Sequence, residues 1–190
     1  MRLTLACAIL ALAFAAGCNQ QSSSSTDSSA APQLDSPAPD SQPNRTFDPA
    51  NDAARTATGA HLTAATTQRL PDAGQQGGDA QEVLTLTGAN GVAIEAQITG
   101  TSPLATQVGG QTLRALLALS VDESQVLVYR VTNETKQNNA GLCGADATAF
   151  VVVWDPETPG ASGYKVLGVM GGQPGAANAR ACPMLEYHEN

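Results

Sequence analysis

The sequence predicts an all-β domain, a small antiparallel sandwich or barrel, preceded by a disordered tether. From Glu82 onward, short runs rich in β-branched residues alternate with Gly, Pro and Asn, which is typical of closely spaced strands and turns. Before that point, Ser, Pro, Gln and Ala dominate a long stretch. Aromatic residues make up only 4% of the chain, so a hydrophobic core is not expected to extend over its whole length.

Seven runs are expected to form strands. Val83–Thr87 and Val92–Ile98 flank Asn90-Gly91, a dipeptide that favours the positive φ angles of a tight hairpin turn. The periodicity of Thr112–Val121 allows a strand or a short helix, and its neighbours favour a strand. The remaining expected strands are Gln125–Thr132, Ala147–Asp155, Tyr164–Met170 and Met184–His188.

The N-terminal segment has the features of a secretory signal. Met1-Arg2 gives a positive start, and Leu3–Ala16 is an apolar run too short to cross a bilayer comfortably. The run ends in Ala15-Ala16-Gly17-Cys18, which resembles the lipobox of bacterial lipoproteins. Ala15 stands where that motif usually has Leu, and the resemblance covers this segment alone.

The lipobox resemblance implies a lipoprotein that is cleaved before Cys18 and anchored by lipid, palmitate included, on that cysteine. Asn19 is not the Asp that commonly signals retention at the inner membrane, so the implied location is the outer membrane, facing the periplasm. Several acyl chains would make the anchoring effectively permanent. An ordinary secretory signal with a coincidental cysteine is the alternative, and Cys7 lies in the removed part.

Three segments are therefore expected: a signal peptide at 1–17, a flexible tether at 18–78 and the β domain at 79–190. Between Asn19 and Asn44, Leu34 is the only large apolar residue, so nothing there offsets the entropy of ordering. Asp48-Pro49 resembles a helix start and several alanines follow it. A weak helix over 49–69 and continued disorder both remain open.

After lipidation of Cys18, the mature chain has two further cysteines, Cys143 and Cys182. In an oxidising periplasm they are expected to form a disulfide. Closing a ring of about 40 residues would stabilise the fold by roughly 4 kcal/mol. A nucleophilic Cys143 is the alternative, but no histidine lies near it in the sequence.

No catalytic site is predicted, so we expect a protein that is not an enzyme. The chain has two histidines, His61 in the expected tether and His188 near the C-terminus, where a segment tends to fray. Asp122-Glu123 is a candidate acidic pair, although adjacent carboxylates between strands usually form a polar turn. Histidine and cysteine do not cluster, so neither a metal site nor another cofactor is expected.

Candidate binding residues lie in two glycine-containing loops. Rigid scaffolds often carry binding function on such loops, although turn geometry alone also accounts for glycine there. The candidates are Asn139, Gly141, Leu142 and Gly144 in the first loop, and Ser162, Gly163 and Tyr164 in the second. The formal net charge of −8 argues against a nucleic-acid partner and suits a basic protein partner.

Two functions are therefore considered for a membrane-anchored protein with an envelope partner. The layout resembles that of small disulfide-bonded β lipoproteins that inhibit lysozyme, which implies an inhibitor of an envelope hydrolase. Trp154 and Ser162–Lys165 are similar to parts of that family's inhibitory loops, but their order and spacing differ, so no residue role is transferred. The alternative is a structural or accessory lipoprotein of an outer-membrane complex, docking through loop tips or an unpaired edge strand.

Overall fold

The computed structural model of the chain describes residues 44–70, 80–120, 125–156 and 163–190, all within one unit, Pro37–Asn190. The expected signal peptide, Cys18, Asp122, Glu123 and Ser162 lie outside the described residues. The described elements are β1 (Arg45–Pro49), α1 (Asp52–Thr58), β2 (Leu62–Arg69), β3 (Gln81–Gly88), β4 (Ala93–Pro103), β5 (Gln107–Val108), β6 (Gln111–Thr112), α2 (Leu113–Leu116), β7 (Gln125–Thr135), β8 (Phe150–Trp154), β9 (Tyr164–Met170), β10 (Arg180–Ala181) and β11 (Leu185–Glu189).

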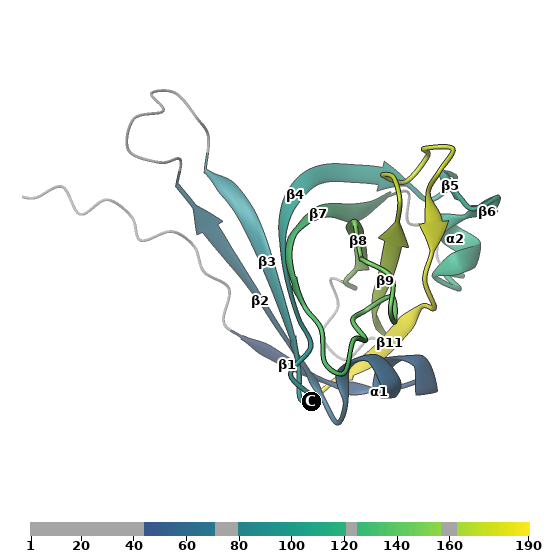
Figure 1. Cartoon of the computed structure of the whole chain (residues 1–190). Coiled ribbons are helices and arrows are strands. Elements are labelled where there is room, and N and C mark those ends of the chain that lie inside the picture. The colour runs from purple at the N-terminus through teal and green to yellow at the C-terminus, as the bar shows by residue number, and fades with distance from the viewer. Residues whose placement is uncertain (1–43, 71–79, 121–124, 157–162) are drawn as a thin grey trace, which may run out of the picture. The chain divides into compact units, whose positions relative to one another are not determined.

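Eight antiparallel strands of this described part form a closed barrel (Figure 1). The order around the ring is β1-β2-β3-β4-β7-β8-β9-β11, and β11 pairs back onto β1. Strands of the ring that follow one another along the chain are therefore neighbours in the barrel, and the small β5–β6 pair is inserted between β4 and β7. The all-β prediction is confirmed, and the barrel is the one of its two predicted architectures that forms.

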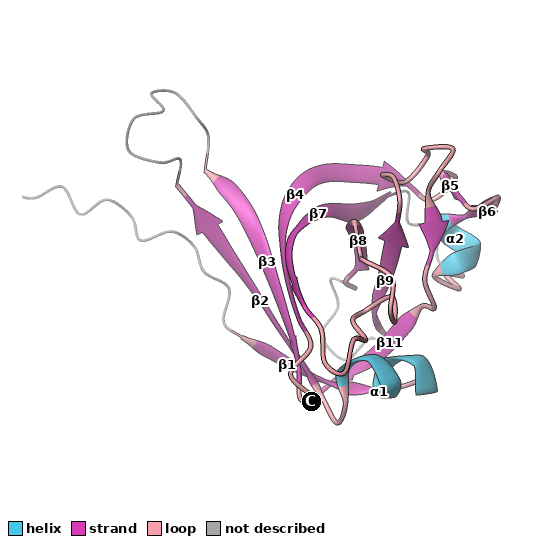
Figure 2. Ribbon diagram, in the orientation of Figure 1, coloured by secondary structure: helices cyan, strands magenta, loops and turns pink. Residues whose placement is uncertain are grey.

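Helices are a minor component of this fold, as Figure 2 shows. α1 spans seven residues and α2 spans four. Within the described ranges, no helix has the length and apolar character needed to cross a bilayer.

The predicted hairpin around Asn90-Gly91 is confirmed. β3 and β4 pair in register from Thr87↔Ala93 onward, and of the two turn residues Gly91 has a positive φ, 90°, whereas Asn90 does not. Ile94 and Ala96 point into the barrel and are almost completely buried, as the alternation of the sequence requires. The strands predicted near β7, β8, β9 and β11 also form, and most of their ends differ from the predicted ends by a few residues.

The predicted start of the β domain at residue 79 is wrong, because β1 and β2 belong to the barrel. Phe47 of β1 pairs with Glu189 of β11 on one side and with Leu62 of β2 on the other. β2 in turn pairs with β3 from Leu62 to Arg69. β2 has the sequence LTAATTQR, and its Ala and Thr residues carry a weak strand signal outside the barrel context.

The weak helix predicted over 49–69 shortens to α1. Asp48-Pro49 ends β1 rather than starting a helix. The helix begins after Asn51, whose Oδ1 accepts a hydrogen bond from the N–H of Ala54 at 2.8 Å. Gly59, with a φ of 80°, ends it. The helix is thus a short cap inside the β1–β2 connection.

The strand favoured for Thr112–Val121 is wrong over its described part. Only Thr112 lies in a strand, β6, and α2 follows it. The Oγ1 of Thr112 accepts a hydrogen bond from the N–H of Ala115 at 3.3 Å and so caps the helix. Leu113 and Leu117, one helical turn apart, are completely buried.

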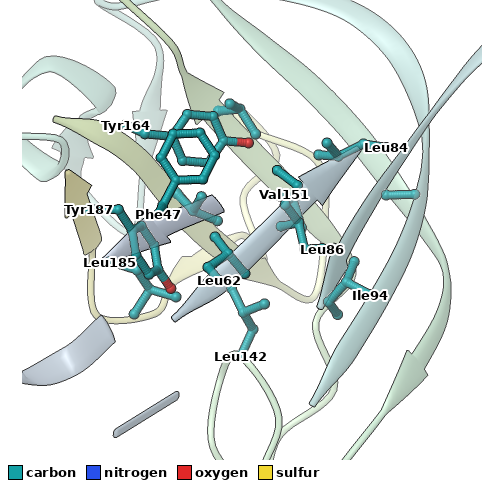
Figure 3. Close-up of a cluster of buried hydrophobic side chains, with 14 of the residues drawn as sticks. Phe47, Leu62, Leu84, Leu86, Ile94, Leu142, Val151, Tyr164, Leu185 and Tyr187 are labelled. Atoms are coloured by element: carbon teal, nitrogen blue, oxygen red, sulfur yellow. The ribbon is translucent and has the colours of Figure 1, made fainter. Parts of the chain in front are cut away.

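The barrel has a core on each side of β8 and β9. Figure 3 shows the inner cluster, in which Phe47 stacks on Tyr164 with ring centroids 4.3 Å apart. The outer cluster joins the outward side chains of β7, β8 and β9 to the segment around α2. Its buried members are Leu104, Val108, Leu113, Leu117, Leu119, Val126, Val128, Phe150, Val152, Trp154, Leu167, Val169 and Ala179. β8, with the sequence FVVVW, is therefore buried on both faces.

Lys165 joins the segment after α2 to the barrel wall. Its side chain is buried on the outer face of β9, where Nζ donates to the backbone oxygen of Leu117 at 3.0 Å. The same Nζ lies 3.4 Å from Oε1 of Glu186. A buried ammonium is tolerated because both contacts compensate its lost hydration.

Arg45 links three strands where the chain enters the barrel. Its Nε donates to Glu189 of β11 at 2.8 Å, and its Nη1 donates to Asp155, which follows β8. The guanidinium also lies over the Phe47 ring, 4.8 Å from its centroid. The hydrogen bond to Glu189 is the main cause that raises the pKa of Arg45, and the same bond lowers the pKa of Glu189.

We expect the protein to lose stability above pH 10 through its three tyrosines, all of which are buried. Burial raises the pKa of Tyr187 to about 12, and burial also raises the pKa values of Tyr129 and Tyr164. These pKa values exceed the unfolded value of about 10, so the neutral phenols stabilise the fold below pH 10 and this contribution declines as the pH rises through the folded values.

The measurement is an alkaline titration that follows phenolate absorbance together with far-ultraviolet circular dichroism. Phenolate should form together with the loss of strand signal. Full ionisation of the tyrosines with an unchanged dichroism spectrum would contradict their buried placement.

Candidate functional site

Four connections meet at one end of the barrel, because alternate connections of an up-and-down antiparallel ring share an end. They are the β1–β2 connection with α1, the β3–β4 turn, the β7–β8 loop and the β9–β11 connection. Residues from all four line one pocket of about 580 Å³. Arg45, the first residue of β1, lies at the opposite end of its strand.

The pocket lining is mostly apolar, with amide and hydroxyl groups among it. The apolar lining residues are Ala53, Ala57, Ala140, Leu142, Pro183 and Leu185. The polar ones are Asp52, Thr56, Asn90, Gln137 and Asn138, and Gly141, Cys143 and Gly144 complete the lining. Asp52 is the one carboxylate of this lining, and its Oδ1 already accepts a hydrogen bond from Arg55 at 2.6 Å. The pocket is suited to an apolar, uncharged group.

Glu134 holds the β7–β8 loop from its base at the end of β7. Oε1 accepts a hydrogen bond from the N–H of Leu142 at 3.2 Å and another from the hydroxyl of Thr148 at 2.8 Å. Oε2 accepts from the N–H of Thr148 at 3.0 Å. One carboxylate therefore fixes both arms of the loop, through hydrogen bonds strengthened by its charge.

The predicted disulfide between Cys143 and Cys182 forms, with the two Cα atoms 5.3 Å apart. It ties the β7–β8 loop to the segment between β10 and β11. It also covers Gly168 of β9, where a Cβ atom would lie 2.5 Å from Sγ of Cys143. The absence of a side chain at Gly168 is what lets the disulfide lie against β9.

Polar side chains connect three of the four parts of the pocket to one another. Nε2 of Gln137, in the β7–β8 loop, donates to the backbone oxygen of Gly91 at 3.2 Å. Nδ2 of Asn90 donates to the backbone oxygen of Ala57, in α1, at 3.0 Å. Lys136 adds bonds from Nζ to two backbone oxygens within its own loop. The pocket wall is thus cross-linked before any ligand arrives, which lowers the entropic cost of binding.

The structure brings the first group of predicted binding residues to this pocket. Gly141, Leu142 and Gly144 line it, and Leu142 is also buried against the inner core. Asn139 lies in the same loop with a φ of 62°, beside Asn138 with a φ of 51°. Such left-handed angles are tolerated by asparagine and shape the loop tip.

The second predicted group is not brought to the pocket. Ser162 lies outside the described residues, and Gly163 precedes β9 at the end of that strand remote from the β9–β11 connection. The sequence predicts Tyr164 both as the start of a strand and as a binding residue; it is the first residue of β9 and is 4% exposed, so the strand prediction is confirmed. Its ring stacks on Phe47 inside the barrel, so it cannot serve as an exposed binding residue.

Sequence reasoning missed the pocket residues of α1, together with Glu134 and Pro183. Asn90 carried a signal, but only for the turn that it forms. Nothing in the pattern Asn133-Glu134-Thr135 marks its carboxylate as the anchor of a loop. His61 precedes β2 and His188 lies in β11, and both are exposed. No group of three or more His, Cys, Asp or Glu placed to hold a metal occurs in the described part of the chain.

Comparison with known proteins gives no match: no family model, no curated protein and no solved structure matches this chain.

Gly168→Ala is expected to destabilise the protein by about 1–3 kcal/mol, because the new methyl group overlaps the disulfide. Denaturant unfolding measures the change in the free energy of unfolding. In a Cys143→Ala/Cys182→Ala background the added cost of Gly168→Ala should become much smaller, since the sulfur atoms are gone. An equal cost in both backgrounds would show that the disulfide is not what requires glycine.

Glu134→Ala is expected to cost about 1–3 kcal/mol, because the N–H groups of Leu142 and Thr148 lose their acceptor. Hydrogen exchange should also quicken at these two amides. The matched control is Glu95→Ala, which removes an exposed pair with Arg69 and should cost less than about 1 kcal/mol. Similar costs for both variants would contradict the anchoring role of Glu134.

Proposed function

We propose that this chain is a membrane-anchored lipoprotein of the cell envelope whose β-barrel binds another protein through the pocket beside α1. The observation that carries the proposal is the pocket itself, with an apolar lining and a wall fixed by a disulfide and by Glu134. A pocket of this volume, about 580 Å³, can take one or two apolar side chains of a partner.

Binding rather than catalysis is supported by the chemistry of the lining. Its one carboxylate, Asp52, already pairs with Arg55, and its one cysteine, Cys143, is in the disulfide. Acid–base or nucleophilic chemistry needs groups that can exchange protons at the reacting atom, and this lining offers little of that kind. A prebuilt apolar pocket with hydrogen-bonding groups around it is instead typical of recognition.

The membrane anchor is supported by the sequence. The lipobox resemblance at Ala15–Cys18 implies lipidation of Cys18, and Asn19 favours the outer membrane. The oxidised pair Cys143–Cys182 fits a periplasmic location, where disulfides persist. In this proposal the barrel lies on the periplasmic face of the outer membrane.

An envelope hydrolase is the partner that we favour. The net charge of −8 would steer a basic enzyme toward the protein. A structural or accessory role in an outer-membrane complex is the second candidate, because the same pocket could seat an apolar side chain of a structural protein. The two candidates differ in what binding does: an inhibitor stops a reaction, whereas an accessory protein leaves reaction rates unchanged.

Ala140→Trp is expected to weaken partner capture about tenfold or more, because the indole occupies the pocket that a partner side chain would fill. The control is Ala105→Trp, at an exposed position that does not line the pocket. Crosslinking in cells followed by capture measures the loss. Equal capture by both variants would contradict binding through the pocket.

The same preparations are assayed against lysozymes and amidases of the envelope. Inhibition that Ala140→Trp abolishes supports the inhibitor role. Capture of a structural envelope protein without any inhibition would replace it with the accessory role.

A further inference from the structure

The outer half of β2 has a neighbour on one side only. β2 pairs with β3 over its full length, from Leu62↔Gly88 to Arg69↔Gln81. On its other side β1 reaches only as far as Arg45↔Ala64. Among the described residues, no strand therefore pairs with Ala65–Arg69 on that side, and Figure 1 shows the β2–β3 hairpin extending away from the rest of the barrel.

The alternation of an antiparallel ladder identifies which backbone groups face this open side. The N–H of Ala89 donates to the backbone oxygen of His61 at 2.9 Å, so the odd-numbered residues of β2 direct their backbone groups to β3. The even-numbered residues point the other way. Of these, Leu62 and Ala64 lie opposite β1, whereas Thr66 and Gln68 have no strand opposite them in the described part of the chain.

Within the described residues, this edge has neither of two features that protect an edge strand in monomeric proteins, a proline or a β-bulge. β2 has no proline, and no register shift interrupts its pairing with β3. Its single charge, Arg69, is neutralised by Glu95 at 2.7 Å. Directly after it comes Leu70, the one large apolar side chain in the described part of the chain that is mostly exposed, at 67%.

We propose that this edge pairs with the same edge of a second copy of the chain. An antiparallel pairing centred on Thr67 would set Thr66 of each copy opposite Gln68 of the other. These are the residues whose N–H and C=O groups face outward, so two hydrogen-bonded pairs and four hydrogen bonds form. Thr67 then faces Thr67 in a pair without hydrogen bonds.

The edge is self-complementary in charge and in length. In this register Ala65 faces Arg69, so no like charges stand opposite each other. The five residues of β2 that have no described strand on this side match the same five of the other copy, because pairing beyond them is blocked where β1 begins to cover Ala64. The extension of the hairpin keeps the two acidic barrels apart (Figure 1). The dimer uses a surface separate from the pocket beside α1, so it stands independently of the proposed function.

Disulfide trapping of Thr67→Cys in the full chain tests the proposal. Opposite residues of a pair without hydrogen bonds have Cα atoms about 4.5 Å apart, which is within the range that a disulfide spans. We expect mild oxidation to give a covalent dimer, and peptide mapping to locate its bond between the introduced cysteines of the two copies. The mapping separates this bond from any formed by Cys7 or Cys18.

The matched control is Thr63→Cys, on the same face of the same strand but opposite Thr46 of β1. It should give about tenfold less dimer than Thr67→Cys, because β1 occupies the position beside Thr63 that the strand of a second copy would need. Adding Thr66→Pro to Thr67→Cys should lower the trapped dimer. The N–H that proline removes has no strand partner among the described residues of the monomer, so the melting temperature should change little.

A yield of the 67–67 bond no greater than the yield of a 63–63 bond would overturn the proposal. So would a 67–67 bond that persists with Thr66→Pro, or an introduced cysteine that bonds to Cys18 or to another protein instead. Gln68→Pro provides a second break of the same edge if Thr66→Pro fails to fold.

Discussion

The pairing of β1 with two neighbours is the constraint on which the rest of the structure depends. β1 is five residues long, and it lies between β11 and β2. Without it the ring would open between these two strands, and both would expose an edge. With it, the inner core closes around Phe47, which is completely buried, and Arg45 links to Asp155 and Glu189 at the mouth.

The length of β1 also decides what remains open. β2 has eight residues, so a strand of five that starts opposite Ala64 covers only the part nearest α1. The same short strand that completes the barrel therefore leaves the hairpin edge without a neighbour among the described strands. Ring closure thus depends on the presence of β1, and the proposed self-association depends on β1 being shorter than β2.

Sequence patterns predicted the strands whose own composition carries the signal. β8 consists of β-branched and aromatic residues and β9 is mostly apolar, because both faces of these strands are buried, and the hairpin turn is marked by Asn90-Gly91. β1 and β2 were not predicted as strands, because their inward positions include residue types that also occur in polar linkers: Arg45, Ala64, Thr66 and Gln68. Only their partners in the ring make them strands.

The candidate site, too, was predicted only where the sequence carries a local signal. The β7–β8 loop was predicted from Cys143 and its glycines, which are local signals. The part of the pocket made by α1 was not, since its position follows from the order of strands around the ring. Tyr164 was predicted in two roles, as the start of a strand and as a binding residue, and only the first is confirmed. A tyrosine after glycine fits a binding loop as well as a strand start, and only the stacking on Phe47 distinguishes them.

The arrangement of the connections has a consequence for steric access. The pocket lies at the α1 end of the barrel, whereas the chain enters β1 at Arg45, at the other end of that strand. The chain therefore enters the first strand of the barrel at the end remote from the pocket. A large partner that approaches the α1 end of the barrel therefore meets the four connections there and not the entry of the chain at Arg45.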